Sequence, residues 1–323
     1  MPENKDIPQG DFVPQGDSAP QGGFVCGAVA VLGKPNVGKS TFLNMALGQK
    51  VAIVSPRPQT TRGAMAGIYQ EPGCQIVFYD TPGIHKPQNE LSHFMLKQVE
   101  EALAGSDAAL FILDARLGVT DEDRLVADWL KKFKGPAWVV MNKADQVPLT
   151  RLGEVADKVR KELGDWPVRS MAAKTGRGVK DLLAEIKRAL PKQPPLFPEE
   201  ELTDKTLRDI AGELVREQCF LQLKEEIPYG VAVVVEKFEE RPAPEPILIQ
   251  ATIYAERESQ KGILIGTGGK QLKSIGTAAR REIENVTNQK VFLELWVKVL
   301  KNWRKDEAVL KRLGYQVPKK RKS

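Results

Sequence analysis

Residues 33–40 constrain the fold of this chain more than any other segment, because they spell Gly-x-x-x-x-Gly-Lys-Ser. The apolar run before them, residues 24–32, predicts a buried strand, and residues 41–47 predict the first turns of a helix. In that setting successive backbone N–H groups and the positive end of the helix converge on phosphate groups. The segment therefore predicts a nucleoside triphosphate site in a P-loop α/β domain.

The side chains of this loop have separate expected roles. Lys39 is expected to reach the outer phosphates and to act catalytically, and the Ser40 hydroxyl is expected to bind Mg²⁺. The remaining positions are expected to act through their backbone. The predicted contacts with the nucleotide are Gly33, Lys34, Pro35, Asn36, Val37, Gly38, Lys39, Ser40 and Thr41.

Residues 142–145, Asn-Lys-Ala-Asp, follow another apolar run and indicate which base is bound. An ionised Asp145 can accept hydrogen bonds from both the ring N–H and the exocyclic amine of guanine, and adenine offers no such pair of donors. Asn142 and Lys143 are expected to brace the loop and to cover the ring. Such a tetrapeptide alone is an ordinary polar turn, but its position after a strand and after the phosphate loop favours GTP or GDP as the ligand.

Between these two segments, Asp80-Thr81-Pro82-Gly83 closes a further predicted strand over residues 75–79. Asp80 is expected to hold Mg²⁺ through water, and the Gly83 N–H is expected to bind the γ-phosphate as a catalytic group. Pro-Gly is a turn signal in any protein. The prediction therefore depends on the order and spacing of all three segments.

Two weaker loops complete the predicted site. In Gln59-Thr60-Thr61-Arg62 one threonine hydroxyl should contact Mg²⁺ and sense the γ-phosphate as part of catalysis, and Thr61 is preferred to Thr60. Ala172-Ala173-Lys174 follows a later strand, and the backbone N–H of Ala173 is expected to meet the guanine oxygen. Taken alone, the first segment is a solvated loop and the second is a turn of small residues.

Together these segments resemble the Era-type GTPases, whose Gly-x-Pro-Asn-Val-Gly-Lys-Ser, Gln-Thr-Thr-Arg, Asp-Thr-Pro-Gly and Asn-Lys-x-Asp motifs occur here in register. The chain departs from the family at Ala172, where serine is usual, so slightly weaker nucleotide affinity is expected. Ile84 stands where Ras-like enzymes have the glutamine that orients water, so slow intrinsic hydrolysis is expected. Asn36 matches a position that helps to bind potassium in related GTPases; this is a hypothesis, and a loop-stabilising side chain is the alternative.

Length and composition predict more than one domain in the 323 residues. Residues 23–190 alternate apolar strands with amphipathic helices, for example 107–113 followed by 121–133, which predicts a mostly parallel sheet with helices on both faces. Residues 191–203 begin with four prolines in eight residues and predict an extended spacer. Residues 1–22 repeat Pro-Gln-Gly and predict a disordered tail.

The predicted second domain, residues 204–316, contains the Gly-x-x-Gly quartet Gly266-Thr267-Gly268-Gly269. In KH domains this loop clamps a single-stranded nucleic-acid backbone, whereas alone it is a glycine-rich turn. A helix, two strands, a helix, the loop, a basic helix and a strand are expected in that order, and the resemblance, which covers residues 24–316, implies a type II α+β KH domain. The residues predicted to bind RNA are Ile265, Gly266, Thr267, Gly268, Gly269, Lys270, Lys273 and Arg280.

Positive charge is concentrated near the C-terminus. Residues 257–323 hold 17 Lys and Arg against 6 Asp and Glu, a net charge of +11, so the rest of the chain carries −5 of the total of +6. Such a region attracts nucleic-acid phosphates, and a solvated lysine-rich surface is the alternative. The basic tail, residues 317–323, also suits an anionic lipid surface, for which weak peripheral contact is expected, and no apolar run is long enough to span a bilayer.

The three cysteines are scattered without metal-ligand spacing, which predicts a reduced cytoplasmic protein, and a monomer is expected. The resemblance implies a GTP-hydrolysing switch that binds small-subunit ribosomal RNA near its 3′ end and assists assembly of the small ribosomal subunit. The residues alone support a guanine-nucleotide switch with a nucleic-acid-binding module. Two alternatives stay open: a peripheral membrane or cell-cycle switch acting through the basic C-terminal region, and a GTPase whose second domain binds protein.

Overall fold

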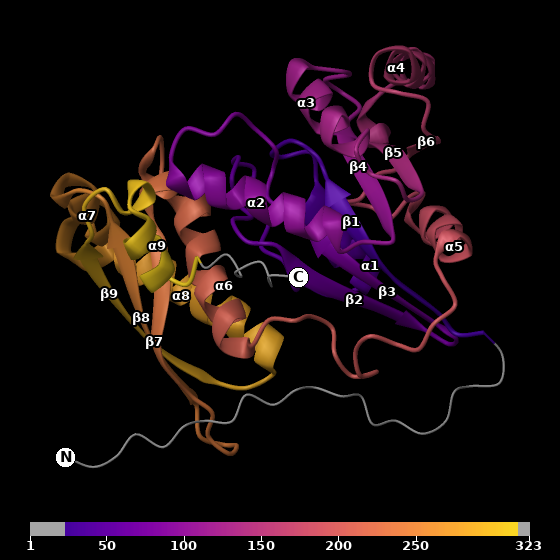
Figure 1. Ribbon diagram of the computed structural model, residues 1–323. Helices are drawn as coiled ribbons and strands as arrows, with labels where there is room; N and C mark the ends of the chain where they lie inside the picture. Colours follow the sequence, from indigo (N-terminus) through magenta and orange to yellow (C-terminus); the bar gives the residue numbers. More distant parts are fainter. Residues whose placement is uncertain (1–22, 316–323) are drawn as a thin grey trace.

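A six-stranded sheet and a three-stranded sheet organise the two domains of this protein, whose computed structural model describes residues 23–315 (Figure 1). The predicted disordered tail, residues 1–22, and the predicted basic tail, residues 317–323, lie outside the described residues. Both predicted domains are present, as an α/β unit followed by an α+β unit.

The first domain has a mostly parallel sheet in the order β2-β3-β1-β4-β5-β6, with only β2 antiparallel to its neighbour. Its central strands are buried along almost their whole length because helices cover both faces. The sequence did not indicate the edge strand β2. The six strands are β1 (Val25–Leu32), β2 (Met65–Glu71), β3 (Cys74–Asp80), β4 (Ala108–Asp114), β5 (Ala137–Asn142) and β6 (Val168–Ser170).

The helices of this domain form two layers, and each layer has its own apolar core against the sheet. Helices α1 and α5 pack on one face, and α2, α3 and α4 pack on the other. The loops that follow the parallel strands therefore meet at one edge of the sheet, as expected for an open α/β sheet. The helices are α1 (Lys39–Leu47), α2 (Glu90–Ala104), α3 (Asp121–Leu130), α4 (Leu149–Glu162) and α5 (Val179–Ala189).

Residues 191–203 form no helix and contain a bend at 196–197 and a turn at 199–200, and they are not a free spacer. The Cys26 N–H donates to the carbonyl of Pro191 at 3.1 Å, and the Ile68 N–H donates to the carbonyl of Leu202 at 2.9 Å. Between these two points the Gln75 side chain accepts from the backbone of residues 196 and 197. Proline prevents a helix here, yet the backbone still offers carbonyl groups to the first domain. The linker is therefore held along the first domain up to the start of α6 (Figure 1).

The second domain has the element order that the sequence predicted for a type II KH domain. Strands β8 and β9 are parallel, β7 pairs antiparallel with β8, and α6, α7 and α8 pack against one face. A final helix follows. The elements are α6 (Leu207–Gln222), β7 (Ala232–Glu239), β8 (Ile247–Ala255), α7 (Glu258–Ile265), α8 (Lys270–Thr287), β9 (Val291–Val299) and α9 (Glu307–Arg312).

The two domains share a small apolar core of their own. Leu91 and Met95 of α2 pack with Ala232 at the start of β7 and with Trp303 and Leu310 near the C-terminus. Trp303 is completely buried, and its indole N–H donates to the carbonyl of Gly230 at 2.9 Å. The end of the KH domain therefore packs against the nucleotide domain, and it does not project away from it.

Candidate functional site

The phosphate loop has the backbone shape that the sequence predicted. Gly33 and Gly38 have positive φ angles of 154° and 101°, and Asn36 has a φ of 63°. A Cβ atom at Gly38 would lie 2.2 Å from the Asn142 amide nitrogen, so only glycine fits there. The Lys39 ammonium lies inside the loop and donates to the carbonyls of Gly33 and Lys34, each at 3.0 Å. These contacts hold Lys39 where an incoming phosphate would meet it.

The Lys34 side chain has a different role from that of Lys39. Its ammonium donates to the Thr120 hydroxyl at 2.7 Å and to the Asp123 carboxylate at 3.0 Å, and both partners are at the start of α3. Lys34 is 4% exposed and Asp123 is fully buried. Lys34 can therefore serve a phosphate only through its backbone, and its side chain fixes the loop to α3. The sequence alone gave no indication of this partner.

Three oxygen-bearing side chains meet beside the loop at the predicted metal position. The Ser40 hydroxyl donates to Asp80 Oδ2 at 2.6 Å, and the Thr61 hydroxyl lies 3.1 Å from Ser40 Oγ and 3.4 Å from Asp80 Oδ2. Burial raises the pKa of Asp80, although Lys39 opposes the shift. Asp80 Oδ1 is buried and has no hydrogen-bond partner among the described residues. Hard oxygen donors around an unsatisfied carboxylate oxygen fit Mg²⁺.

The geometry also supports the choice of Thr61 over Thr60. The Thr60 hydroxyl is occupied within its own loop, where it donates to the carbonyl of Arg57 at 2.9 Å and lies 2.7 Å from the Ser55 hydroxyl. The Arg62 side chain points away from the site. Thr61 is therefore the residue of this loop whose side chain faces the metal position.

The segment after β3 approaches the phosphate loop closely. A Cβ atom on Gly83 would lie 2.6 Å from the backbone nitrogen of Pro35, so a larger residue cannot fit without movement. The Thr81 hydroxyl donates to the carbonyl of Val31 at 2.7 Å, which makes it a structural group, and Pro82 beside it is buried. Gly83 lines the nucleotide cavity.

Asn142 braces the base-binding loops, as predicted. Its amide donates to the carbonyl of Val37 at 2.7 Å, and its Oδ1 accepts from the Ala173 N–H at 2.9 Å. In this structure the Ala173 N–H is therefore occupied by Asn142, and its contact with the guanine oxygen stays a prediction. The Lys174 N–H has no backbone partner among the described residues, and Lys174 lines the nucleotide cavity, so this N–H is an alternative donor. Ala172 pairs with Arg177 across the same turn.

Lys143 bridges the phosphate and base loops. Its ammonium donates to the carbonyl of Asn36 at 2.8 Å and to Asp114 at 2.7 Å. Burial alone would raise the pKa of Asp114, but hydrogen bonds from Arg116 and Lys143 outweigh it and hold the pKa at about 2. Asp145 is exposed beyond these groups, where its carboxylate is free to accept from a base.

A cavity of about 600 Å³ connects these loops. Most of the predicted phosphate-loop residues line it, together with Thr61, Gly83, Lys143 and Lys174. Sequence reasoning missed Asp114 and Arg116, which also line it. Their position at the carboxyl end of the apolar strand β4, where Asp114 is the last residue of the strand, was the available signal, because the carboxyl ends of parallel strands meet at one edge.

Titration of Lys39 gives a testable property of this cavity. Burial lowers the pKa of Lys39 to about 8, and Asp80 opposes the shift only in part. Bound phosphates should raise this pKa again, so Lys39 should take up protons when GDP binds. The expected uptake per protein molecule is about half a proton at pH about 8 and about a tenth of a proton at pH about 7. Calorimetric titration of the Mg²⁺-free protein with GDP, in buffers of different ionisation enthalpy, measures this uptake. Uptake that does not change with pH would contradict the prediction.

The Gly-x-x-Gly quartet forms an exposed loop between α7 and α8. Gly266, Gly268 and Gly269 have φ angles of 70°, 60° and 76°, and Cβ atoms on the last two would meet nothing within 4 Å. Basic side chains recur at helical spacing along α8 beside this loop, whereas Ile265 is half-buried under it. The loop leaves its backbone open, with basic side chains beside it, as a phosphate chain requires. The basic residues are Lys270, Lys273 and Arg280.

Among the described residues no helix is both long and apolar enough to cross a bilayer.

Comparisons with known proteins agree with both halves of the chain. Residues 28–143 match the family described as 50S ribosome-binding GTPase, and residues 226–304 match the KH domain. GTPase Era from Geobacter metallireducens is 44% identical over 90% of this chain and 98% of its own length. GTPase Era from Halothermothrix orenii is 43% identical over the same shares of the two chains.

Two solved structures have the same architecture along 91% of this chain and 100% of their own. One is Era in complex with MgGDPNP and nucleotides 1506–1542 of 16S ribosomal RNA, at 37% identity and a TM-score of 0.88. The other is a tyrosine-to-alanine variant of Aquifex aeolicus Era bound to GDP and AlF4⁻, at 37% identity and a TM-score of 0.87. With identities above 40% to relatives that it covers almost completely, this chain belongs to the Era family of GTPases.

Proposed function

We propose that this GTPase is a Mg²⁺-dependent switch that binds single-stranded RNA from the 3′ end of small-subunit ribosomal RNA and assists assembly of the small ribosomal subunit. The observation that carries the proposal is the likeness to Era bound to MgGDPNP and nucleotides 1506–1542 of 16S ribosomal RNA. The exposed Gly-x-x-Gly loop and the basic face of α8 support it independently.

Ser40 and Thr61 would hold Mg²⁺ through their hydroxyls, and Asp80 would do so through water. The ion supplies charge neutralisation on the β- and γ-phosphates when it is bound. Lys39 would stabilise the same phosphates from inside the loop, and the Gly83 N–H would donate to the γ-phosphate. Asp145 would accept from the guanine ring, while Asn142 and Lys143 hold the surrounding loops together.

Water must be oriented without a glutamine side chain. Ile84 is 2% exposed, and its N–H donates to the carbonyl of Gly33 at 3.1 Å. Its apolar side chain can neither donate to nor accept from water. We assign the orientation of water to backbone groups around Thr61, which makes slow intrinsic hydrolysis the expected behaviour.

Potassium is the proposed second cation, and Asn36 is its proposed ligand. The Asn36 amide nitrogen donates to the carbonyl of Pro56 at 2.7 Å, and within residues 23–315 its Oδ1 has no partner. Loss of a cation that offsets transition-state charge should lower turnover by at least about tenfold. We therefore expect faster GTP turnover in KCl than in NaCl at equal ionic strength, and Asn36→Ala should remove the difference. Equal turnover in the two salts would exclude the potassium role.

RNA binding is tested with an oligonucleotide copied from the 3′ end of small-subunit ribosomal RNA and with a scrambled control of equal length. The full chain is loaded with GDP or with a non-hydrolysable GTP analogue. We expect binding of the first oligonucleotide to be at least about a hundredfold tighter than binding of the control, to change with the nucleotide, and to weaken with salt. Equal weak binding of both would leave a GTPase with another partner.

Cytoplasmic location, the monomeric state and weak peripheral membrane contact are further parts of the proposal. The scattered cysteines support the cytoplasmic location, and the basic C-terminal region supports the membrane contact. Vesicle binding without RNA affinity would instead favour the membrane alternative, in which the basic region serves lipid.

A further inference from the structure

The switch segment, residues 59–62, lies against the second domain, and the chain just before it is anchored there too. The Lys50 ammonium forms ion pairs with Glu217 of α6 at 2.7 Å and with Glu282 of α8 at 2.8 Å. The other oxygen of Glu217 accepts from the Val54 N–H at 2.8 Å. Glu217 is 2% exposed, so this contact is protected from water. The approach to the switch segment is thus fixed by helices of the KH domain.

Thr60 and Arg62, which precede and follow Thr61, also contact the second domain. Arg216 of α6 donates to the carbonyl of Thr60 and stacks on the Phe220 ring at 5.4 Å. The Arg62 guanidinium donates to the carbonyls of Val231 at 2.6 Å and Tyr229 at 2.9 Å. Arg216 is 1% exposed and Arg62 is 3% exposed.

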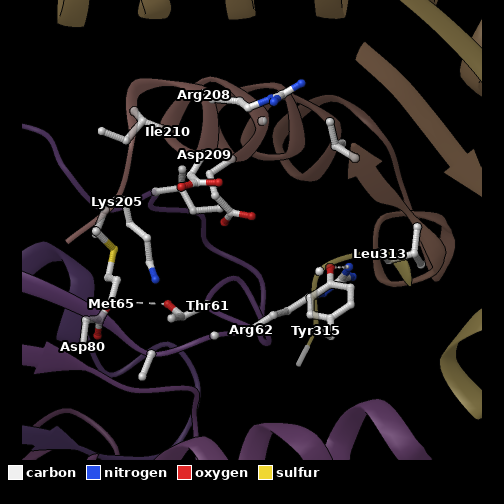
Figure 2. A pocket seen from close by; sticks show the side chains of 18 of the residues that line it. Thr61, Arg62, Met65, Asp80, Lys205, Arg208, Asp209, Ile210, Leu313 and Tyr315 are labelled. Carbon is white, nitrogen blue, oxygen red and sulfur yellow. Dashed lines mark hydrogen bonds between the residues drawn. The ribbon is translucent and has the colours of Figure 1, made fainter. Parts of the chain in front are cut away.

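Arg62 is further enclosed by aromatic rings of the second domain. It lies 5.3 Å from the Trp303 ring and 5.8 Å from the Phe220 ring. It also donates to the Tyr315 hydroxyl at 3.3 Å, and Figure 2 shows Arg62 beside Tyr315. A guanidinium held in this way cannot reach the phosphates as a catalytic arginine. Its position instead directs the preceding side chain, Thr61, toward Ser40 and Asp80.

Thr61 has open space on both sides. It lines the nucleotide cavity and also a second cavity of about 500 Å³ between the domains, which Asp80, Glu213 and Tyr315 line as well (Figure 2). Packing therefore does not hold the threonine at the metal position. The contacts of Thr60 and Arg62 with the second domain restrain the backbone on both sides of it, in addition to its own hydroxyl contacts with Ser40 and Asp80.

We propose that Arg216 is a positioning residue for GTP hydrolysis, because it holds Thr61 at the metal and γ-phosphate position from the KH domain. The inference depends on the proposed role of Thr61. In this arrangement the second domain completes the hydrolytic site. A movement of α6 on RNA binding would then displace Thr61 beside the bound nucleotide.

Arg62 and Arg216 together hold the switch segment against the second domain, and we call this pair the clamp. Its composition allows it to open. Two adjacent buried guanidiniums repel one another, although Glu213 of α6 pairs with Arg216. Burial lowers the pKa of Arg62, Tyr315 opposes this shift, and the neighbouring Arg216 adds to it. Arg62 Nε and Arg216 Nη1 have no hydrogen-bond partner within residues 23–315. Buried charges with incomplete partners contribute less than a fully satisfied network of the same size. A clamp of this composition can therefore be released by a competing interaction.

Arg216→Met tests the proposal, because it keeps an unbranched side chain on Phe220 and removes the donor to Thr60. We expect kcat for GTP hydrolysis and affinity for a non-hydrolysable GTP analogue each to fall by at least about tenfold, since a displaced catalytic group is costly. GDP affinity should change by less than about twofold, because GDP lacks the γ-phosphate that Thr61 senses. Arg216→Lys, which keeps a donor, should restore part of kcat.

Arg208→Met is the matched control. Arg208 is an exposed arginine of the same helix and donates to the carbonyls of Val235 and Glu236 of β7, not to the switch segment. Its substitution should leave kcat and both affinities unchanged. If Arg216→Met lowers GDP and GTP-analogue affinity equally, or leaves kcat unchanged, the proposal is wrong.

Thr61→Ala separates this proposal from the function on which it depends. We expect Thr61→Ala to lower kcat, and we expect the double variant with Arg216→Met to be no worse than Thr61→Ala alone, because both act through one hydroxyl. Normal turnover in Thr61→Ala would reject the role of Thr61 itself. Impaired Thr61→Ala with fully additive effects in the double variant would reject only the positioning by Arg216.

Discussion

Asp145→Asn should lower GTP affinity by at least about a hundredfold and create affinity for xanthosine triphosphate, because two charge-assisted hydrogen bonds to guanine are lost. The Asp145 carboxylate can accept from both the ring N–H and the exocyclic amine of guanine. An asparagine side chain can accept only one of these two hydrogen bonds, through its amide oxygen. Its NH₂ group then faces the exocyclic amine of guanine, so that two donors meet with no acceptor between them. Xanthine has a carbonyl oxygen at that position, which the asparagine can satisfy.

The structure makes this substitution a clean test of base recognition. Asp145 is exposed and lies two positions after Lys143, which lines the nucleotide cavity, whereas Asn142 and Lys143 are held in the protein by hydrogen bonds. Asp145→Asn should therefore leave folding unchanged. Competition binding with GTP and xanthosine triphosphate measures the change in relative affinity for the two nucleotides. Asp157→Asn, at an exposed position of α4, is the control and should bind GTP normally. Unchanged GTP affinity in Asp145→Asn would mean that another group reads the base.

Gly269→Asp should weaken RNA binding by at least about a hundredfold, because it places a negative charge where the loop approaches the phosphate chain. A Cβ atom at Gly269 would meet nothing within 4 Å, so the effect is electrostatic and does not come from crowding inside the protein. The exposed Lys270 and the neighbouring Lys273 would lose part of their attraction for phosphate. The double variant with Gly268→Asp should be weaker still.

Gly73→Asp is the matched control for the backbone effect. Gly73 lies in the turn between β2 and β3, has the same φ of 76°, and is equally open around its Cβ position. Both variants should lose similar stability from the left-handed backbone, but Gly73→Asp should bind RNA normally. GTP hydrolysis without RNA should be unchanged in both. Equal RNA binding by the two variants would show that residues 266–269 are only a turn.

The loops that line the nucleotide cavity could be located from the sequence, although Asp114 and Arg116 were missed. Phosphate, metal and base loops are contiguous segments, and each acts through local backbone shape, so residue type and order are enough to identify them. The same holds for residues 266–269 and for β9, which is the strand expected after the basic helix, because alternation of apolar residues fixes a strand locally. The edge strand β2 was missed, because half of it is only partly buried and its pattern is weak.

Only the tertiary structure decided which distant groups meet these loops. Lys34 pairs with Asp123, the Ala173 N–H is taken by Asn142, and the linker lies along the first domain. Arg216 reaches Thr60 across 156 positions of the chain. No local pattern encodes such contacts, because they depend on how two complete domains pack together. The sequence therefore specified the chemistry of the site, and the packing of the KH domain against the switch segment decided what holds that chemistry in place.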